Sequence, residues 1–458
     1  MTPPRGVLLP LALAQFLCSF AGSNMNVMIT DISADLNTTV SGVQLTITLY
    51  LLVMAALMIP GGKLTDRFGR KRCFVAGLVL YGAGALVAAI APTLGVLVLG
   101  NSLLEGIGTA MLIPPVYILA TLLFTEASSR ARAFGMIMAM GGIGAAAGPL
   151  LGGLITTTLG WRAAFGFQVL IVAVIIGSSR RILDPLPPDP GRPFDIRGAI
   201  LSAAGLVLLV AGILAAQEDL AMMCTLLVAG AVVLAIFFAG VRAEERAGRE
   251  PLLSTRLFRN RTANLGLLTQ HLQWLILMGT SFVVSAYLQV VRGYNAVETG
   301  VVFTAATLGM LLTSLPAARL ARRWSRRTLI VAGFALTVTG IAVLLAPAGQ
   351  VSGPWGFAPG LLLLGLGLGT MLTPSVDLVQ SAFGERLQGE ISGLSRSVSN
   401  LGSALGAAVA GTILVARADS HGYATAMITL AGLAGAGLLV ALALPRAAEP
   451  RSAAREGH

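Results

Sequence analysis

The stretch Gly62-Lys63-Leu64-Thr65-Asp66-Arg67-Phe68-Gly69-Arg70-Lys71-Arg72 separates two long apolar segments, residues 41–61 and 73–92. Five of its residues are Lys or Arg, whereas the two flanking segments carry no charge. A bilayer core about 30 Å thick is crossed by a helix of roughly 20 apolar residues. The stretch is therefore predicted to connect two membrane-spanning helices at one face of a membrane.

Apolar segments of this length recur along the whole chain. Of the 458 residues, 55% are hydrophobic and only 11% are charged, far from the roughly 25% charged residues of a soluble domain. The predicted fold class is therefore all-α, a polytopic membrane protein with fourteen transmembrane helices. The spans are predicted near residues 7–30, 41–61, 73–92, 94–123, 131–157, 162–179, 197–216, 221–241, 263–289, 296–317, 328–346, 356–380, 389–415 and 422–444.

Basic residues are concentrated in alternate connections between these spans. If the N-terminus is cytoplasmic, all but three of the 31 Lys and Arg residues lie on the cytoplasmic side, the exceptions being Arg162, Arg292 and Arg417. Lys and Arg favour cytoplasmic loops, so both termini are expected to be cytoplasmic. This distribution accounts for the net charge of +11 with a lipid bilayer as partner and excludes a nucleic-acid-binding groove.

The chain also repeats itself. The run Leu64–Lys71 returns in degraded form at residues 320–327, and Gly148 and Gly153 correspond to Gly406 and Gly411. Such repeats predict two six-helix bundles related by duplication. The expected domains are an N-terminal bundle at 1–183, a linker with two extra transmembrane helices at 184–250, a C-terminal bundle at 251–447 and a cytoplasmic tail at 448–458.

The opening stretch resembles the signature loop of the major facilitator superfamily. Its glycines permit a tight turn, and Asp66 can pair with a nearby arginine or sit against a helix end. The resemblance implies a conformational latch that holds one state and releases in another; the alternative is a basic loop that only anchors the chain. The latch residues would be Gly62, Asp66, Arg67, Gly69, Arg70 and Arg72.

A second motif, Gly144-Ala145-Ala146-Ala147-Gly148-Pro149-Leu150-Leu151-Gly152-Gly153, lies inside the fifth predicted span. It resembles the antiporter motif of exporters in the same superfamily. Pro149 should bend the helix, and Gly144, Gly148, Gly152 and Gly153 should allow close helix packing. The alternative is an ordinary interface of small residues.

Further stretches are similar to those of the fourteen-span drug/proton antiporter family: Trp161–Phe165, Tyr287–Tyr294 and Gly402–Gly406. This resemblance implies a multidrug or antibiotic efflux transporter that exports small amphipathic or apolar compounds against an inward proton flow by alternating access. A lipid-handling or other non-drug member of the same fold is the alternative, and uptake is disfavoured by the span-five motif.

Two departures from that family's pattern concern the proton pathway. Ala21 replaces an acid in the first span, and Ser102 and Glu105 replace Arg and Gln in the fourth. Glu105 is predicted near the middle of the bilayer, where an ionised carboxylate is costly, so it is the preferred proton carrier. The alternative is a neutral acid that only bonds two helices. Asp31 and His271 are further candidates, with a solvated helix-end acid and an interhelical hydrogen bond as their respective alternatives.

Polar and soft side chains within spans suggest the substrate cavity. The candidates are Asn24, Asn26, Met28, Met54, Gln270 and Trp274; interhelical hydrogen bonds and plain packing are the alternatives. Asp377, Glu390 and Arg396 are expected to cluster near the cytoplasmic mouth, either as an ion pair or as a gate.

Signatures of catalysis are missing from the sequence. Only three histidines and three cysteines occur, without metal-ligand spacing, and no phosphate-binding Gly-Lys-Ser/Thr run is found. The protein is therefore not expected to be an enzyme or to need a metal or cofactor. Arginine outnumbers lysine 29 to 2, which suggests a bacterium of high G and C content; we expect a monomer in its plasma (inner) membrane, with small molecules and protons as partners.

Overall fold

The computed structural model describes residues 5–445 apart from 125, 185–186, 190, 192–193, 216–218, 315, 317–319, 321–322, 347–352 and 384–386, and apart from the side chains of 5, 66, 127–128, 130–131, 146, 354 and 388–389. Within these residues all regular structure is helical. The segments are α1 (Arg5–Asn24), η1 (Met25–Val27), α2 (Ile29–Asp35), α3 (Val40–Phe68), α4 (Arg70–Ala89), α5 (Leu94–Leu97), η2 (Val98–Glu105), α6 (Gly106–Leu123), α7 (Ala127–Leu159), α8 (Trp161–Ser179), α9 (Ile196–Leu214), α10 (Leu220–Arg246), η4 (Thr255–Arg259), α11 (Arg261–Ala286), η5 (Tyr287–Val291), α12 (Ala296–Ser314), α14 (Arg326–Leu345), η6 (Pro354–Phe357), α15 (Ala358–Gln380), α16 (Gln388–Ala416) and α17 (Ser420–Leu442).

Fourteen helices in the described chain are long and apolar enough to cross a membrane. Each overlaps one predicted span, so the prediction of an all-helical polytopic protein is confirmed. Many of these helices begin where a polar side chain accepts a hydrogen bond from a backbone N–H of the first turn, which satisfies a donor that the helix itself leaves unpaired. The capping residues are Thr39, Thr93, Asp195, Asp219, Asn260, Ser325 and Asp419.

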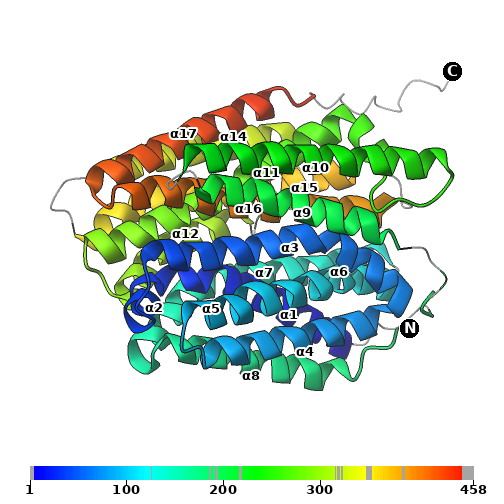
Figure 1. Cartoon of the computed structure of the whole chain (residues 1–458), viewed down its shortest axis with the longest axis horizontal. Coiled ribbons are helices and arrows are strands. Elements are labelled where there is room, and N and C mark those ends of the chain that lie inside the picture. The colour runs from blue at the N-terminus through cyan, green and yellow to red at the C-terminus, as the bar shows by residue number, and fades with distance from the viewer. Residues whose placement is uncertain are drawn as a thin grey trace.

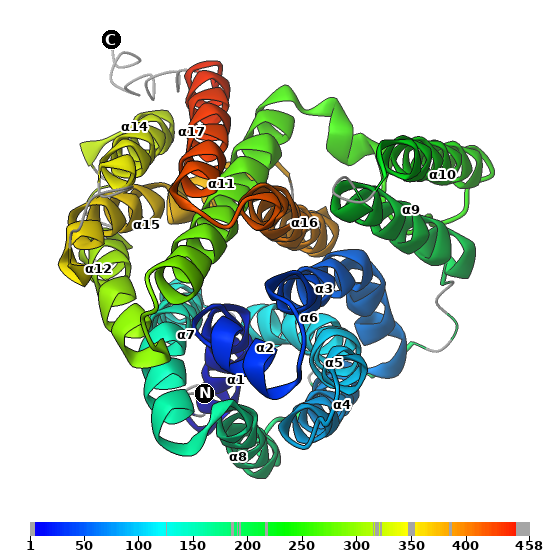
Figure 2. The ribbon, with the colours of Figure 1, turned by 60° about the vertical axis from the view of Figure 1, so that its left-hand side comes forward.

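The long helices lie side by side along the longest axis of the molecule (Figure 1). Figure 2 shows α1–α8 gathered into one group, here called the N-terminal bundle, and α11–α17 into a second, the C-terminal bundle. The helices α9 and α10 pack against each other at one side, and α9 also contacts α3 and α16.

Glycine allows the helices of each bundle to approach at backbone distance. A Cβ added at Gly77 or Gly84 of α4 would overlap the carbonyl oxygens of Gly108 and Gly100. In lipid no hydrophobic force draws helices together, so close packing of small residues supplies much of the attraction.

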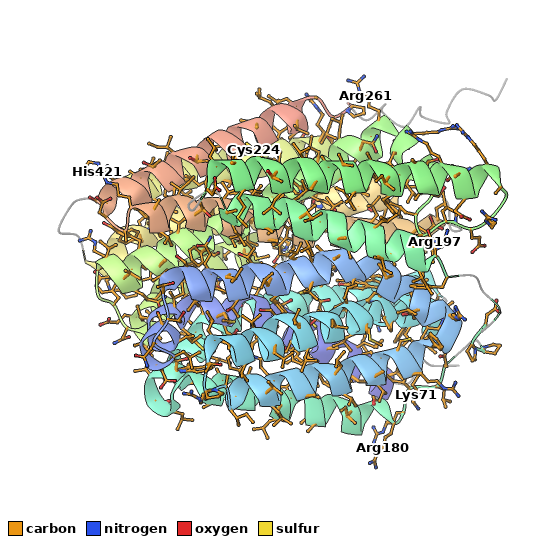
Figure 3. The ribbon with its side chains drawn as sticks, in the orientation of Figure 1. Lys71, Arg180, Arg197, Cys224, Arg261 and His421 are labelled. Atoms are coloured by element: carbon orange, nitrogen blue, oxygen red, sulfur yellow. The ribbon has the colours of Figure 1, made fainter. Side chains whose placement is uncertain are left out.

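The two ends of the molecule differ in charge. In Figure 3, Lys71, Arg180 and Arg197 lie at one end, here called the basic end, whereas His421 lies at the opposite end. Chain connectivity places Arg162, Arg292 and Arg417, the three exceptions of the sequence pattern, at that opposite end.

The predicted signature loop is shorter than expected. The helix α3 continues to Phe68 and α4 begins at Arg70, so Gly69 alone joins them, with φ 97° and ψ 143°. This backbone conformation is accessible almost only to glycine. Gly62, expected to help form a turn, instead lies within α3.

We expect Gly69→Ala to lower the free energy of unfolding by about 1–3 kcal/mol, because a side chain would strain the backbone at this position. Gly62→Ala is the matched control, since its added Cβ would make only an ordinary contact, 3.8 Å from Cβ of Pro114. Unfolding of the purified protein by titration with a denaturing detergent would measure both variants. Equal stability of the two would contradict the strain argument.

Candidate functional site between the two bundles

The antiporter-like motif of α7 has two glycine faces. The first packs on α1: a Cβ at Gly144 would collide with the carbonyl of Phe16, and one at Gly148 with the side chain of Ser23. A Cβ at Gly152 would meet Cβ of Asn24 at 2.9 Å.

The second face of α7 meets α12 of the other bundle. A Cβ at Gly153 would collide with the carbonyl of Ala296, and one at Gly300 with the carbonyl of Pro149. Backbones from the two bundles are therefore in direct contact here, and Pro149 and Gly153 of the predicted motif form part of this α7–α12 interface.

A second interface joins α3 to α16. The amide nitrogen of Gln44 donates hydrogen bonds to the carbonyls of Ala407 and Ala408, at 3.0 and 3.1 Å. Further along, the hydroxyl of Ser397 donates to the carbonyl of Ala55. These bonds use backbone acceptors at small residues, so the two helices remain close over much of their length.

At the basic end an ion pair links the bundles. Lys63 Nζ lies 3.4 Å from Glu390 Oε1, and both side chains are largely buried, with exposed fractions of 14% and 25%. Glu390 Oε2 also accepts a hydrogen bond from the backbone N–H of Ser254 at 3.2 Å. One carboxylate thus connects α3, α16 and the segment before α11.

A further contact lies deeper between the bundles. The guanidinium of Arg396 on α16 donates to the hydroxyl of Tyr117 on α6, and its Cζ lies 4.7 Å from the centre of the Tyr117 ring. The Tyr117 hydroxyl donates in turn to Gln15 Oε1 on α1, at 2.9 Å. The expected cluster of Asp377, Glu390 and Arg396 is not formed, because Asp377 pairs with Arg326 at 2.6 Å instead.

At the opposite end, Gln289 of η5 links the C-terminal bundle to the N-terminal bundle. Its amide nitrogen donates to the carbonyl of Asn26 at 2.8 Å. Its oxygen accepts from the backbone N–H and the hydroxyl of Thr30, both at 3.3 Å. Polar contacts therefore cross the boundary at three depths.

Glu105 lies inside the N-terminal bundle and is fully buried. Its Oε2 accepts a hydrogen bond from Asn101 Nδ2 at 3.2 Å, whereas Oε1 is buried with no hydrogen-bond partner in the described structure. The neighbouring Ser102 donates to the carbonyl of Thr46 at 2.7 Å. An ionised carboxylate oxygen without a partner would be costly at this buried position.

The other two proton candidates lie elsewhere. Asp31 is half-buried on α2 at the opposite end, outside the spans, where burial raises the pKa of its carboxyl above the ordinary value. His271 on α11 places Nδ1 3.2 Å from the carbonyl of Val398 on α16, within the C-terminal bundle. The structure does not bring these two residues together with Glu105.

The predicted cavity residues divide into two groups. Asn24, Asn26, Met28 and Met54 are buried in the N-terminal bundle, and both amide atoms of Asn24 lack a partner in the described structure. Gln270 and Trp274 lie on α11 of the C-terminal bundle, where Trp274 is half-buried. The side chain of Gln270 donates a hydrogen bond to the carbonyl of Ser375 at 2.9 Å and accepts one from Ser395 at 2.6 Å, so it binds α11 to its own bundle.

The predicted latch residues surround the Gly69 junction. Arg67 lies 5.6 Å from the Phe68 ring centre, Arg70 is buried and Arg72 is exposed, and the side chain of Asp66 lies outside the described residues. The carboxylate of Asp184 accepts from the backbone N–H of Lys71 at 3.2 Å and so ties the start of α4 to the segment after α8.

Sequence reasoning assigned no role to several residues that form the contacts between the bundles or support them: Gln15, Gln44, Lys63, Tyr117 and Gln289. Four of these are amide or phenol side chains within apolar segments. Because polar groups within spans need partners, that pattern was a usable signal, although it does not identify the partner.

Comparison with known proteins gives a consistent result. The profile of the Major Facilitator Superfamily matches residues 11–407. The chain is 32% identical to a puromycin resistance protein of Streptomyces alboniger, over 89% of this chain and 81% of that protein. It is 30% identical to a probable actinorhodin transporter of Streptomyces coelicolor, over 90% and 72% of the two chains, and 31% identical to a cephamycin export protein of Amycolatopsis lactamdurans, over 87% and 83%.

We expect Gly144→Ala to lower the free energy of unfolding by about 1–3 kcal/mol, the usual effect of overpacking. Its Cβ would press on the backbone of Phe16, which cannot move without shifting α1. Gly142→Ala on the same helix is the control, because no atom lies within 4 Å of its added Cβ. Detergent-induced unfolding measures both; a stable Gly144→Ala would show that α1 and α7 are not in close contact.

The Lys63–Glu390 ion pair should show a coupling free energy of about 0.5–1 kcal/mol in a double-mutant cycle. The cycle compares Lys63→Ala, Glu390→Ala and the double variant by the same unfolding titration. A second cycle of Lys63→Ala with Asp377→Ala is the control, because Asp377 pairs with Arg326 instead. Equal coupling in both cycles would mean that the measured energy is not specific to the pair.

Proposed function

Because this chain belongs to the major facilitator superfamily, a family of membrane transporters for small molecules, we propose that it is a proton-coupled antiporter that exports small amphipathic or apolar compounds. The observation that carries this proposal is similarity over 87–90% of the chain to proteins named for antibiotic resistance, transport or export. Antibiotics and other secondary metabolites are the proposed substrates.

The contacts between the bundles support transport by alternating access. The α3–α16 and α7–α12 interfaces hold helix backbones together, and they can serve as the surfaces on which the bundles rock. The Lys63–Glu390 pair and the bonds of Gln289 lie at opposite ends. In the proposed cycle one set breaks while the other is formed, so each end of the pathway opens in turn.

Glu105 is the proposed proton carrier. Its burial makes the ionised form costly, because one carboxyl oxygen lacks a partner in the described structure, and the hydrogen bond that Asn101 donates to the other oxygen offsets only part of this cost. It stands at the last residue of η2, a widened helical segment that contacts α3 and α4. A change in that packing would expose the carboxyl to water and allow the proton to leave.

The proton gradient can supply the energy for export. Moving one charge across the membrane contributes about 2.3 kcal/mol per 100 mV, and each 1.4 kcal/mol corresponds to about a tenfold concentration ratio. One proton per substrate is therefore sufficient for more than tenfold accumulation outside the cell.

The proposed location is the bacterial plasma membrane, with the protein as a monomer. The basic end would face the cytoplasm, because Lys and Arg are retained on that side. Both termini would then be cytoplasmic.

Everted vesicles with an acidic interior test the coupling. Adding puromycin or a cephamycin, the compounds for which two relatives are named, should dissipate the pH gradient in vesicles that carry the wild-type protein. Glu105→Gln should reduce this response at least about tenfold, because the amide cannot release a proton. Glu126→Gln, at an exposed acid between α6 and α7, is the control and should respond like the wild type.

Substrate exchange separates loss of coupling from loss of folding. Exchange of labelled for unlabelled substrate at equilibrium needs no net proton movement, so Glu105→Gln should retain it. Equal gradient collapse in Glu105→Gln and wild type would exclude Glu105 as the carrier. Loss of both coupling and exchange would assign Glu105 a structural role.

A further inference from the structure

Arg396 is an unusual residue for its position. It belongs to α16 and lies inside the span Glu390–Ala416, yet its guanidinium contacts Tyr117 and so lies against the N-terminal bundle. A cation within a span is costly and generally faces an opposite charge, a backbone carbonyl or a water-filled pathway.

The described carboxylates Glu390 and Asp377, which are close to Arg396 in sequence, do not neutralise it, and neither does Glu105. Glu390 is engaged by Lys63 and by the Ser254 N–H, and Asp377 pairs with Arg326. Glu105 is enclosed in the N-terminal bundle beside Asn101. Among the described residues no carboxylate forms a salt bridge with Arg396, so its positive charge is available to another anion.

The hydrogen-bonding pattern leaves part of the guanidinium free to bind. Arginine has five N–H donors in a planar fork. The Tyr117 hydroxyl gives its own hydrogen to Gln15, so its oxygen can only accept from Arg396. Arg396 is half-buried, and its remaining donors can therefore reach a carboxylate, for which the fork is well matched.

Aromatic and thioether groups adjoin this cation. The ring centre of Phe134 on α7 lies 5.9 Å from that of Tyr117, and Met138, one turn further along α7, places its sulfur 4.0 Å from the Tyr117 hydroxyl. A positive charge beside soft apolar surface suits an amphipathic acid better than a cation or an uncharged polar molecule.

We propose that Arg396 binds the carboxylate of exported amphipathic monoanions, and that Tyr117 positions its guanidinium between the bundles. This inference rests on the proposed export function and specifies the substrate class. Since Tyr117, the partner of Arg396, comes from α6 while Arg396 itself comes from α16, the bound anion would contact both bundles.

Cefoxitin, a cephamycin with one carboxylate, and its uncharged methyl ester provide a matched pair of probes. Uptake of each into everted vesicles measures export. The wild-type protein should transport the acid at least about tenfold more efficiently than the ester, since a charge-assisted hydrogen bond contributes that much. Arg396→Gln should abolish this preference by slowing the acid alone, and Arg396→Lys should retain part of it.

Two controls keep the result specific. Arg326→Gln removes the same charge from the same bundle but at the exposed Asp377 pair, and should leave the preference unchanged. Tyr117→Phe retains the ring but removes the hydroxyl, so it should reduce the preference without abolishing ester transport.

The possible outcomes separate this inference from the proposed function. If Arg396→Gln slows acid and ester equally, Arg396 is a gate or a packing residue and the anion site is wrong. If the wild-type protein moves the ester but not the acid, export stands and the substrate class is wrong. If it moves neither these compounds nor puromycin, the export function fails, and the anion site with it.

Discussion

The close approach of helix backbones at glycine is the interaction on which the architecture depends. In lipid no hydrophobic force draws helices together, so van der Waals contacts between closely approaching backbones must supply much of the attraction. Glycines of α7 provide this on two faces, toward Phe16 within the bundle and toward Ala296 across the boundary. The same helix therefore holds its own bundle together and forms the surface on which the other bundle rests.

Helix positions could be predicted from the sequence because they depend on local properties. Apolar length and polar interruptions defined fourteen spans, and the structure has a helix at each. The Gly69 junction was placed correctly but was expected to be longer, because hydropathy does not distinguish a loop from the polar ends of two continuing helices. Backbone conformation at a single residue determines that difference.

Partners across the bundle boundary could not be predicted. Lys63 and Glu390 are 327 residues apart, and Tyr117 and Arg396 are 279 apart, so no local pattern connects them. Arg396 was therefore grouped with Asp377 and Glu390, its neighbours in sequence, whereas each of the three has a different partner in space. The role of Glu105 remains a prediction; the structure places its carboxyl fully buried beside Asn101.

The side position of α9 makes the two bundle interfaces unequal. It contacts both α3 and α16, so one interface is shielded from acyl chains, while Figure 2 shows no described spanning helix on the outer side of α7 and α12. Lateral pressure and bilayer thickness act on whatever surface the lipid touches. Lipid composition should therefore influence the rocking motion chiefly through the α7–α12 interface. The α3–α16 interface, which α9 covers, should respond less to changes in the membrane.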